Sequence, residues 1–96
     1  MLLEKDEYVH FDSEKEKCDI LLALDAGGYD CSWYQIKDGV VGYPYYIGAG
    51  WVFLTNAGRI DGIYRPQPSA NAITYEEFMG RTAPLAIHGL NLEDLL

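Results

Sequence analysis

The apolar positions of this chain fall into short runs that are separated by turn residues. Between residues 31 and 65, β-branched and aromatic residues are interrupted by Asp38-Gly39 and by Asn56-Ala57-Gly58, which is the pattern of strands joined by tight turns. Asp-Gly tolerates the positive φ angles of a hairpin turn. We therefore expect a small antiparallel β-meander of three to five strands across residues 31–65, beginning with a strand at 31–36. An earlier strand is expected at residues 8–11.

Residues 13–26 fit two periodicities. Ser13 and Glu16 form the pattern of a capping box, and apolar residues then follow at helical spacing until Gly27, which favours an N-terminal helix. Every second residue from Cys18 to Leu24 is also apolar, which is the period of a strand. The helix is the preferred interpretation, and the strand remains the alternative.

The last third of the chain contains helix signals behind a loop. Two prolines between residues 65 and 71 predict a loop, because proline breaks regular structure. Thr74 and Glu77 form a second capping box, which predicts a short helix as far as Gly80, and Asn91 would cap a last helical turn. The predicted fold class is α+β: the meander, an N-terminal helix and short C-terminal helices in a single domain spanning residues 1–96.

The composition predicts one globular core. The 96 residues are 49% hydrophobic and 14% aromatic, which is richer than chains too polar to collapse. Charges precede any apolar run of signal-peptide length, and no apolar stretch reaches 18 residues. We expect a soluble, cytoplasmic protein that does not insert into a membrane. Cys18 and Cys31 are the only cysteines, and we expect buried thiols rather than a disulfide.

The charge is negative and unevenly distributed. Residues 1–38 hold ten acids and four bases, residues 39–75 one acid and two bases, and residues 76–96 four acids and one base, for a net charge of −8. Binding to phosphates depends on clustered Lys and Arg, so direct binding of nucleic acid is not expected. A protein partner with a basic surface is favoured instead.

Residues with catalytic or ligand-binding potential occur singly. His10 and His88 lack a nucleophile or acid in a catalytic pattern, and a Cys31–His88 dyad would rest on residue type alone. Asp25 and Asp30 flank a glycine pair, which fits a turn better than a cation loop. The segment 48–50 resembles a phosphate loop but lacks its later glycine and lysine. We therefore expect no enzyme, no cofactor and no metal site.

Aromatic residues are concentrated in the nearly neutral middle of the chain. Nine of the thirteen lie between residues 29 and 64, and strand alternation would place some on each face of a thin sheet. Tyr and Trp are typical interface anchors, although the same rings could equally form the core. The predicted partner-binding residues are seven of these nine aromatic residues and two neighbouring acids: Tyr29, Trp33, Tyr34, Tyr43, Tyr45, Tyr46, Trp51, Asp25 and Asp30.

Two functions follow from this layout. The first is a non-enzymatic inhibitor or sequestering protein that binds a basic, nucleic-acid-handling target, with acidic flanks for steering and aromatic rings for affinity. In size and charge the chain resembles small acidic phage anti-defence proteins, such as anti-CRISPR and anti-restriction proteins, and toxin-immunity proteins. The alternative is an oligomeric binder of a nucleotide or similar ligand, with a pocket formed by residues 43–46, Trp51 and an arginine. A homodimer is compatible with both functions.

Overall fold

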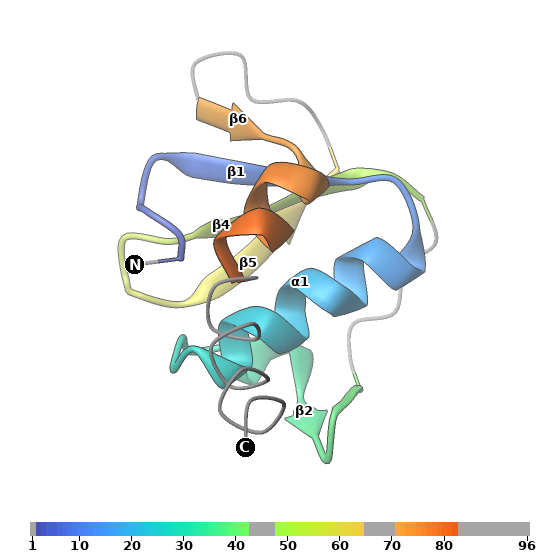
Figure 1. Ribbon diagram of the computed structural model, residues 1–96. Helices are drawn as coiled ribbons and strands as arrows, with labels where there is room; N and C mark the ends of the chain where they lie inside the picture. The colour runs from blue at the N-terminus through green and yellow to red at the C-terminus, as the bar shows by residue number, and fades with distance from the viewer. Residues whose placement is uncertain (1, 43–47, 65–70, 83–96) are drawn as a thin grey trace, which may run out of the picture.

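The computed structural model describes residues 2–42, 48–64 and 71–82. The elements in chain order are β1 (Glu7–Phe11), α1 (Glu14–Ala26), the 3₁₀ turn η1 (Ser32–Tyr34), β2 (Ile36–Lys37), β3 (Val40–Val41), β4 (Gly50–Leu54), β5 (Ile60–Ile63) and β6 (Asn71–Ile73). A second helix covers residues 75–82. The fold is α+β, as the sequence predicts, with an N-terminal helix and a short helix near the C-terminus (Figure 1).

The strands form two sheets rather than one meander. The main sheet has the order β5-β4-β1-β6, with β1 antiparallel to β4 and parallel to β6, and β2 and β3 form a separate two-stranded sheet. The strand predicted at residues 31–36 is wrong, because Ser32–Tyr34 forms η1 and Gln35 takes a positive φ of 50°. This turn redirects the chain before β2 begins. Only the second hairpin of the expected meander therefore joins the main sheet.

α1 confirms the helical interpretation of residues 13–26 over the strand alternative. The Glu16 amide donates to the Ser13 hydroxyl (3.2 Å), and the Glu16 carboxylate accepts from the Asp12 amide (2.9 Å), so the carboxylate reaches one residue beyond the capping residue itself. The helix buries Lys17, Ile20, Leu21 and Leu24. That spacing belongs to one helical face and not to alternate strand positions.

Other local signals are also confirmed. Asp38 and Gly39 take φ angles of 54° and 76° in the β2–β3 hairpin, as expected for a turn with two positive φ angles. The Glu77 amide donates to the Thr74 hydroxyl (3.0 Å) at the start of the second helix, which continues to residue 82, beyond the predicted end at Gly80. The predicted loop is outside the described residues from 65 to 70, and so is the predicted cap at Asn91.

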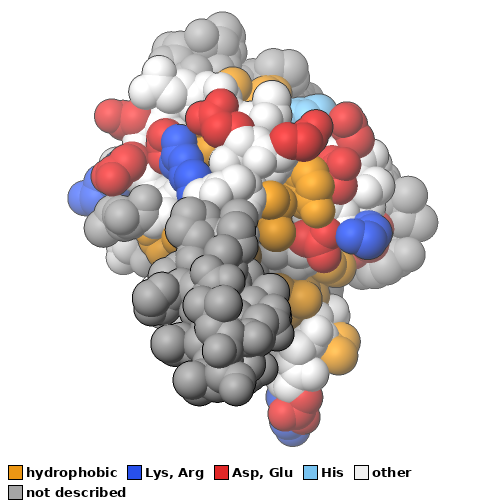
Figure 2. Space-filling model, viewed as in Figure 1, with side chains coloured by type: hydrophobic (Ala, Val, Ile, Leu, Met, Phe, Trp, Pro, Cys, Tyr) orange, Lys and Arg blue, Asp and Glu red, His pale blue; other side chains and the backbone are white. Residues whose placement is uncertain are grey.

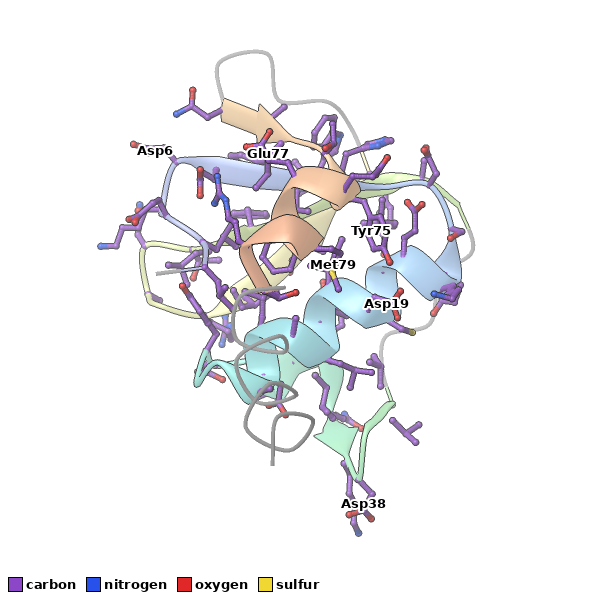
Figure 3. The ribbon with its side chains drawn as sticks, in the orientation of Figure 1. Asp6, Asp19, Asp38, Tyr75, Glu77 and Met79 are labelled. Carbon is purple, nitrogen blue, oxygen red and sulfur yellow. The ribbon has the colours of Figure 1, made fainter. Side chains whose placement is uncertain are left out.

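The core lies on one face of the main sheet. Both helices cover this inner face (Figure 1), where α1 and the second helix meet through a hydrogen bond from the Tyr75 hydroxyl to Asp19 (2.7 Å; Figure 3). The buried apolar residues of the sheet and helices form one cluster: Val9, Phe11, Ile20, Leu21, Leu24, Val52, Ile60, Ile73 and Phe78. Within the described part of the chain, no helix lies on the opposite, outer face.

Arg81 joins the second helix to the sheet. Its guanidinium donates to both carboxylate oxygens of Glu7 (2.7 and 2.8 Å) and to the Leu2 carbonyl (3.0 Å). The hydrogen bond with Arg81 lowers the pKa of Glu7, against a smaller opposing effect of burial. Hydrogen bonds from Lys15 and Tyr75 likewise lower the pKa of Asp19. Both carboxylates therefore favour the folded state only while they are ionised.

We expect the protein to lose stability in acid. A carboxylate with a lowered folded pKa contributes stability above its unfolded pKa, and this contribution is lost as the pH falls through the folded pKa. The free energy of unfolding should be flat near neutral pH and fall below the ordinary Glu value of 4.5. Arg81→Gln should remove about 1 kcal/mol at pH 7 and flatten part of this decline. Urea unfolding between acid and neutral pH measures both effects.

The control for this experiment is Lys37→Gln, which makes the same change in charge at an exposed position on the β2–β3 hairpin. It should leave the pH dependence unchanged. An Arg81→Gln variant whose acid profile matches the wild type would show that the pair with Glu7 does not couple protonation to folding.

Candidate functional site

Two neighbouring strands place aromatic rings on the outer face of the main sheet. Because side chains alternate along a strand, Tyr8 and His10 of β1 point away from the core residues Val9 and Phe11. The register pairs Tyr8 with Phe53 and His10 with Trp51, so all four rings emerge on the same side. We call these four residues the aromatic face.

The rings of the aromatic face pack in two cross-strand pairs. Tyr8 and Phe53 stack with ring centroids 4.7 Å apart and planes at 21°, and His10 and Trp51 lie 4.7 Å apart with planes tilted by 58°. All four side chains are half-buried. Each ring is thus held by a neighbour while part of it remains accessible to solvent. Such rings can anchor a partner at a low cost in side-chain entropy.

The surroundings of the aromatic face are polar and acidic. The register places Asp61 beside Phe53 and Ile63 beside Trp51 on β5, and Ala72 beside Tyr8 on β6. Asp12 lies 3.6 Å from the imidazole of His10. The Asp61 carboxylate accepts a hydrogen bond from the Gly62 amide (2.8 Å), which satisfies a donor on the edge strand β5.

A groove of about 510 Å³ opens at one end of the aromatic face. Its walls are the turn before β1, the end of β4 and the start of β6, and the Tyr8–Phe53 stack lies along it. Its lining combines rings, amides, a hydroxyl and both signs of charge: Lys5, Asp6, Tyr8, Phe53, Leu54, Thr55, Asn56 and Asn71.

The structure separates the residues that the sequence grouped into one binding patch. Trp51 belongs to the aromatic face, whereas Trp33 lies on η1 with 49% of its surface exposed. Asp25 is exposed in the last turn of α1 and Asp30 is exposed beyond its end, and the Asp30 carboxylate accepts from the Ser32 amide (3.0 Å). Asp30 therefore acts as a local turn acceptor. Tyr43, Tyr45 and Tyr46 lie outside the described residues.

Two of the predicted tyrosines have structural contacts. Tyr34 is 1% exposed, because η1 turns its ring into the core and not onto a sheet face, so a contact between Tyr34 and a partner is ruled out in the folded chain. The Tyr29 hydroxyl accepts from the Leu3 amide (2.9 Å) and donates to the Leu3 carbonyl (3.1 Å). Tyr29 thereby fixes the N-terminal segment against the end of α1.

Of the aromatic face, only Trp51 was among the predicted site residues; Tyr8, His10 and Phe53 were missed. The signal was present, because residues 8–11 and 51–54 both alternate a ring with a residue that turns out to face the core. Two strands with matching alternation become one surface only when they are neighbours in register. The pairing of β1 with β4 supplies that register.

The cysteines do not have the properties of nucleophiles. Both are free thiols, and Cys31 is buried. Burial, with smaller contributions from Asp25 and Asp30, raises the pKa of Cys31 to about 12, so the reactive thiolate is nearly absent at neutral pH. His88, the partner considered for Cys31, lies outside the described residues. Among the described side chains, no three of His, Cys, Asp and Glu are grouped so that they could hold a metal ion.

Carboxylates gather on the helix side of the molecule. Figure 2 shows them across the second helix and the first turns of α1, where Asp12, Glu76 and Glu77 are exposed. Two cations there, Lys15 and Arg81, form ion pairs with acids. The carboxylates of the two helices and the aromatic face therefore lie on opposite sides of the main sheet, whereas Asp6, Asp12 and Asp61 lie close to the aromatic face.

These features define a small α+β domain with an open aromatic sheet face and an acidic helix side. No family model, no curated protein and no solved structure matches the chain. The helices in the described ranges include none with the length and hydropathy needed to cross a membrane.

Proposed function

We propose that this chain is a non-enzymatic, acidic binding protein that inhibits or sequesters a basic protein, and that the aromatic face is its contact surface. The observation that carries the proposal is the outer face of the main sheet, where four rings remain accessible with no described helix over them. Trp and Tyr, which the aromatic face contributes through Trp51 and Tyr8, are among the side chains that most often dominate binding energy at protein interfaces.

The charge supports a basic partner. A net charge of −8 on 96 residues accelerates encounter with a positive surface and slows encounter with nucleic acid or an anionic membrane. Carboxylates beside the aromatic face, those of Asp12 and Asp61, can also occupy positions on a target where phosphates would otherwise bind. A nucleic-acid-handling protein offers such positions, which is the basis for proposing inhibition.

The acids and the rings have different roles in this proposal. Because they lie largely on opposite sides of the sheet, most carboxylates act at long range and the rings act in contact. At physiological salt, dissolved ions screen the attraction between exposed charges over a distance of about 8–10 Å. Raising the salt concentration should therefore slow association strongly, whereas removing rings should accelerate dissociation.

The test is photo-crosslinking from two positions in lysate of the source cells. A benzophenone side chain at position 53 should crosslink to a basic protein, and the same group at position 40 should not, because Val40 lies on the separate β2–β3 hairpin although it is 64% exposed. The double variant Trp51→Ser with Phe53→Ser should weaken binding of the captured protein about 30-fold or more. Raising the salt concentration from about 0.05 to 0.3 M should weaken the binding of the captured protein to the wild-type chain.

Other results would reject the proposal. Equal crosslinking from positions 40 and 53, an acidic captured protein, or binding unaffected by salt would each contradict it. A crosslink to a second copy of the chain, with a dimer in sedimentation that the double variant loses, would assign the aromatic face to self-association.

A small ligand is the second candidate function, and the groove beside Tyr8 and Phe53 is the observation that favours it. The pocket expected at residues 43–46 lies outside the described residues. A nucleotide would need its phosphate neutralised, and among the described residues that line this groove Lys5 is the only cation and has Asp6 beside it. These described residues are therefore better suited to a cationic ligand than to a phosphate.

A further inference from the structure

We propose that the groove at the end of the aromatic face is a subsite for a cationic side chain, an arginine guanidinium, that the partner inserts. The inference rests on the proposed function for the identity of the partner, but its chemistry can be tested without one. Two properties of the groove carry it, an aromatic wall and oxygen acceptors, together with the net charge of −8 on the whole chain, which attracts cations.

The aromatic wall is the Tyr8–Phe53 stack. The two rings lie nearly parallel at 4.7 Å, so each ring covers one face of the other, and both residues line the groove. Guanidinium groups are planar and weakly hydrated, and they stack on aromatic faces more readily than ammonium groups do. The face of an aromatic ring repels an anion for the same electrostatic reason.

The polar walls supply acceptors for a guanidinium. Asp6 contributes a carboxylate, Asn56 and Asn71 contribute amide oxygens, and Thr55 contributes a hydroxyl. A guanidinium has five N–H donors and no acceptor, so a lining rich in oxygen suits it. Lys5 is the one opposing charge in the lining, and its exposed side chain can extend into water.

Backbone hydrogen bonds fix the walls of the groove. The Asn71 amide donates to the Asp6 carbonyl (3.1 Å), which ties the turn before β1 to β6. On the opposite wall, the Thr55 amide donates to the Arg59 carbonyl (2.8 Å), and the Arg59 amide donates to the Thr55 hydroxyl (3.1 Å). The backbone of these walls and the Thr55 hydroxyl are therefore held in place before a ligand arrives, which lowers the entropic cost of binding.

The experiment is a titration with N-acetyl-arginine amide, followed by ¹H–¹⁵N NMR of the full chain. Its neutral isostere N-acetyl-citrulline amide and the anion AMP are titrated in parallel. Arginine amide should shift the side-chain amides of Asn56 and Asn71 and bind at least about fivefold more tightly than the citrulline compound, since a charge-assisted hydrogen bond is lost in the isostere.

Two substitutions test whether the groove prefers a positively charged ligand. Asp6→Asn should weaken binding of arginine amide about three- to tenfold, and Lys5→Gln should strengthen it. Asp38→Asn is the matched control, because it removes the same charge at the far end of the molecule, on the hairpin tip (Figure 3). Asn also tolerates the positive φ of 54° at that position. This control should change binding by less than twofold.

Several results would overturn the inference. They are equal binding of the arginine and citrulline compounds, equal effects of Asp6→Asn and Asp38→Asn, no shift at the groove, or AMP binding that Lys5→Gln weakens. The last would assign the groove to a nucleotide. The outcomes also separate the two proposals. Arginine binding without a crosslinked partner would support the subsite and reject the proposed function. A crosslinked basic partner without arginine binding would support the proposed function and reject the subsite.

Discussion

Replacing Tyr34 with alanine is expected to cost about 3–5 kcal/mol of unfolding free energy, whereas the same change at its neighbour Trp33 should cost less than about 1 kcal/mol. The two residues are adjacent in η1 and are both large aromatics, but Tyr34 is 1% exposed and Trp33 is 49% exposed. Removing the Tyr34 ring leaves a cavity in the core, while removing the Trp33 ring mainly uncovers surface.

The contacts of Tyr34 explain why the cavity cannot close easily. Its hydroxyl is 2.5 Å from the position that a Cβ on Gly62 would occupy, so β5 packs directly against this ring through a glycine. The Lys17 ammonium lies 5.6 Å from the centre of the same ring. Burial raises the pKa of the Tyr34 phenol well above its usual value, which keeps the group neutral at any physiological pH.

Urea unfolding of the two alanine variants measures this difference. Each curve should be analysed for its midpoint and its slope, because a changed slope would indicate a changed unfolded state. Equal losses for Tyr34→Ala and Trp33→Ala would contradict the assignment of one ring to the core and the other to the surface. Tyr34→Phe serves as the conservative control and should retain most of the stability, since it keeps the ring.

Local features of this fold could be predicted because neighbouring residues determine them. The Ser13 cap and the Thr74 cap each need one side-chain oxygen and an amide two or three residues later. The turn at Asp38-Gly39 needs two residues that accept positive φ. In each case the chemistry lies within four residues of sequence, so the pattern alone was sufficient to locate the element.

Long-range pairing could not be predicted in the same way. β6 has three residues and no alternation that marks it as a strand, and it is ordered by pairing with β1, where Val9 and Ile73 are register partners. The separation of β2 and β3 from the main sheet likewise depends on η1, since Gln35 with φ 50° ends any continuous strand. Such outcomes depend on tertiary packing more than on strand propensity.

One half of the aromatic face could be predicted from local alternation, and the other half depends on long-range pairing. Alternation alone placed Trp51 and Phe53 on the face opposite Val52, and the structure agrees. The other half of the aromatic face comes from β1, more than 40 residues earlier, and only the register brings Tyr8 and His10 beside them. Tyr34 failed as a site residue because alternation does not apply within a 3₁₀ turn.

The buried position of Lys17 is the feature of the core that is hardest to predict from the sequence. A lysine in an amphipathic helix normally faces water, yet Lys17 is 1% exposed. Its ammonium lies 5.6–5.8 Å from the centres of three rings, those of Phe11, Tyr34 and Tyr64, and 3.3 Å from the Tyr64 hydroxyl. Rings from β1, η1 and the end of β5 thus surround one cation, which joins three parts of the fold.

We therefore expect Lys17→Glu to cost more than about 3 kcal/mol or to prevent folding, because it buries a negative charge against ring faces that repel it. Lys15→Glu makes the same change in charge two residues earlier in α1, at a side chain that is 81% exposed, and should cost much less, because it loses only the exposed ion pair with Asp19. Lys17→Met keeps the apolar stem but removes the charge, and it should cost about 1–2 kcal/mol through the lost cation–ring contacts.

Thermal and urea unfolding of the three variants provide the measurement, and Lys17→Met keeps the prediction testable if Lys17→Glu does not fold. A Lys17→Glu protein as stable as Lys15→Glu would show that the ammonium is not enclosed by the rings. A Lys17→Met protein more stable than the wild type would show that desolvating the cation costs more than the three rings return. The wild-type lysine would then be retained for a reason other than stability.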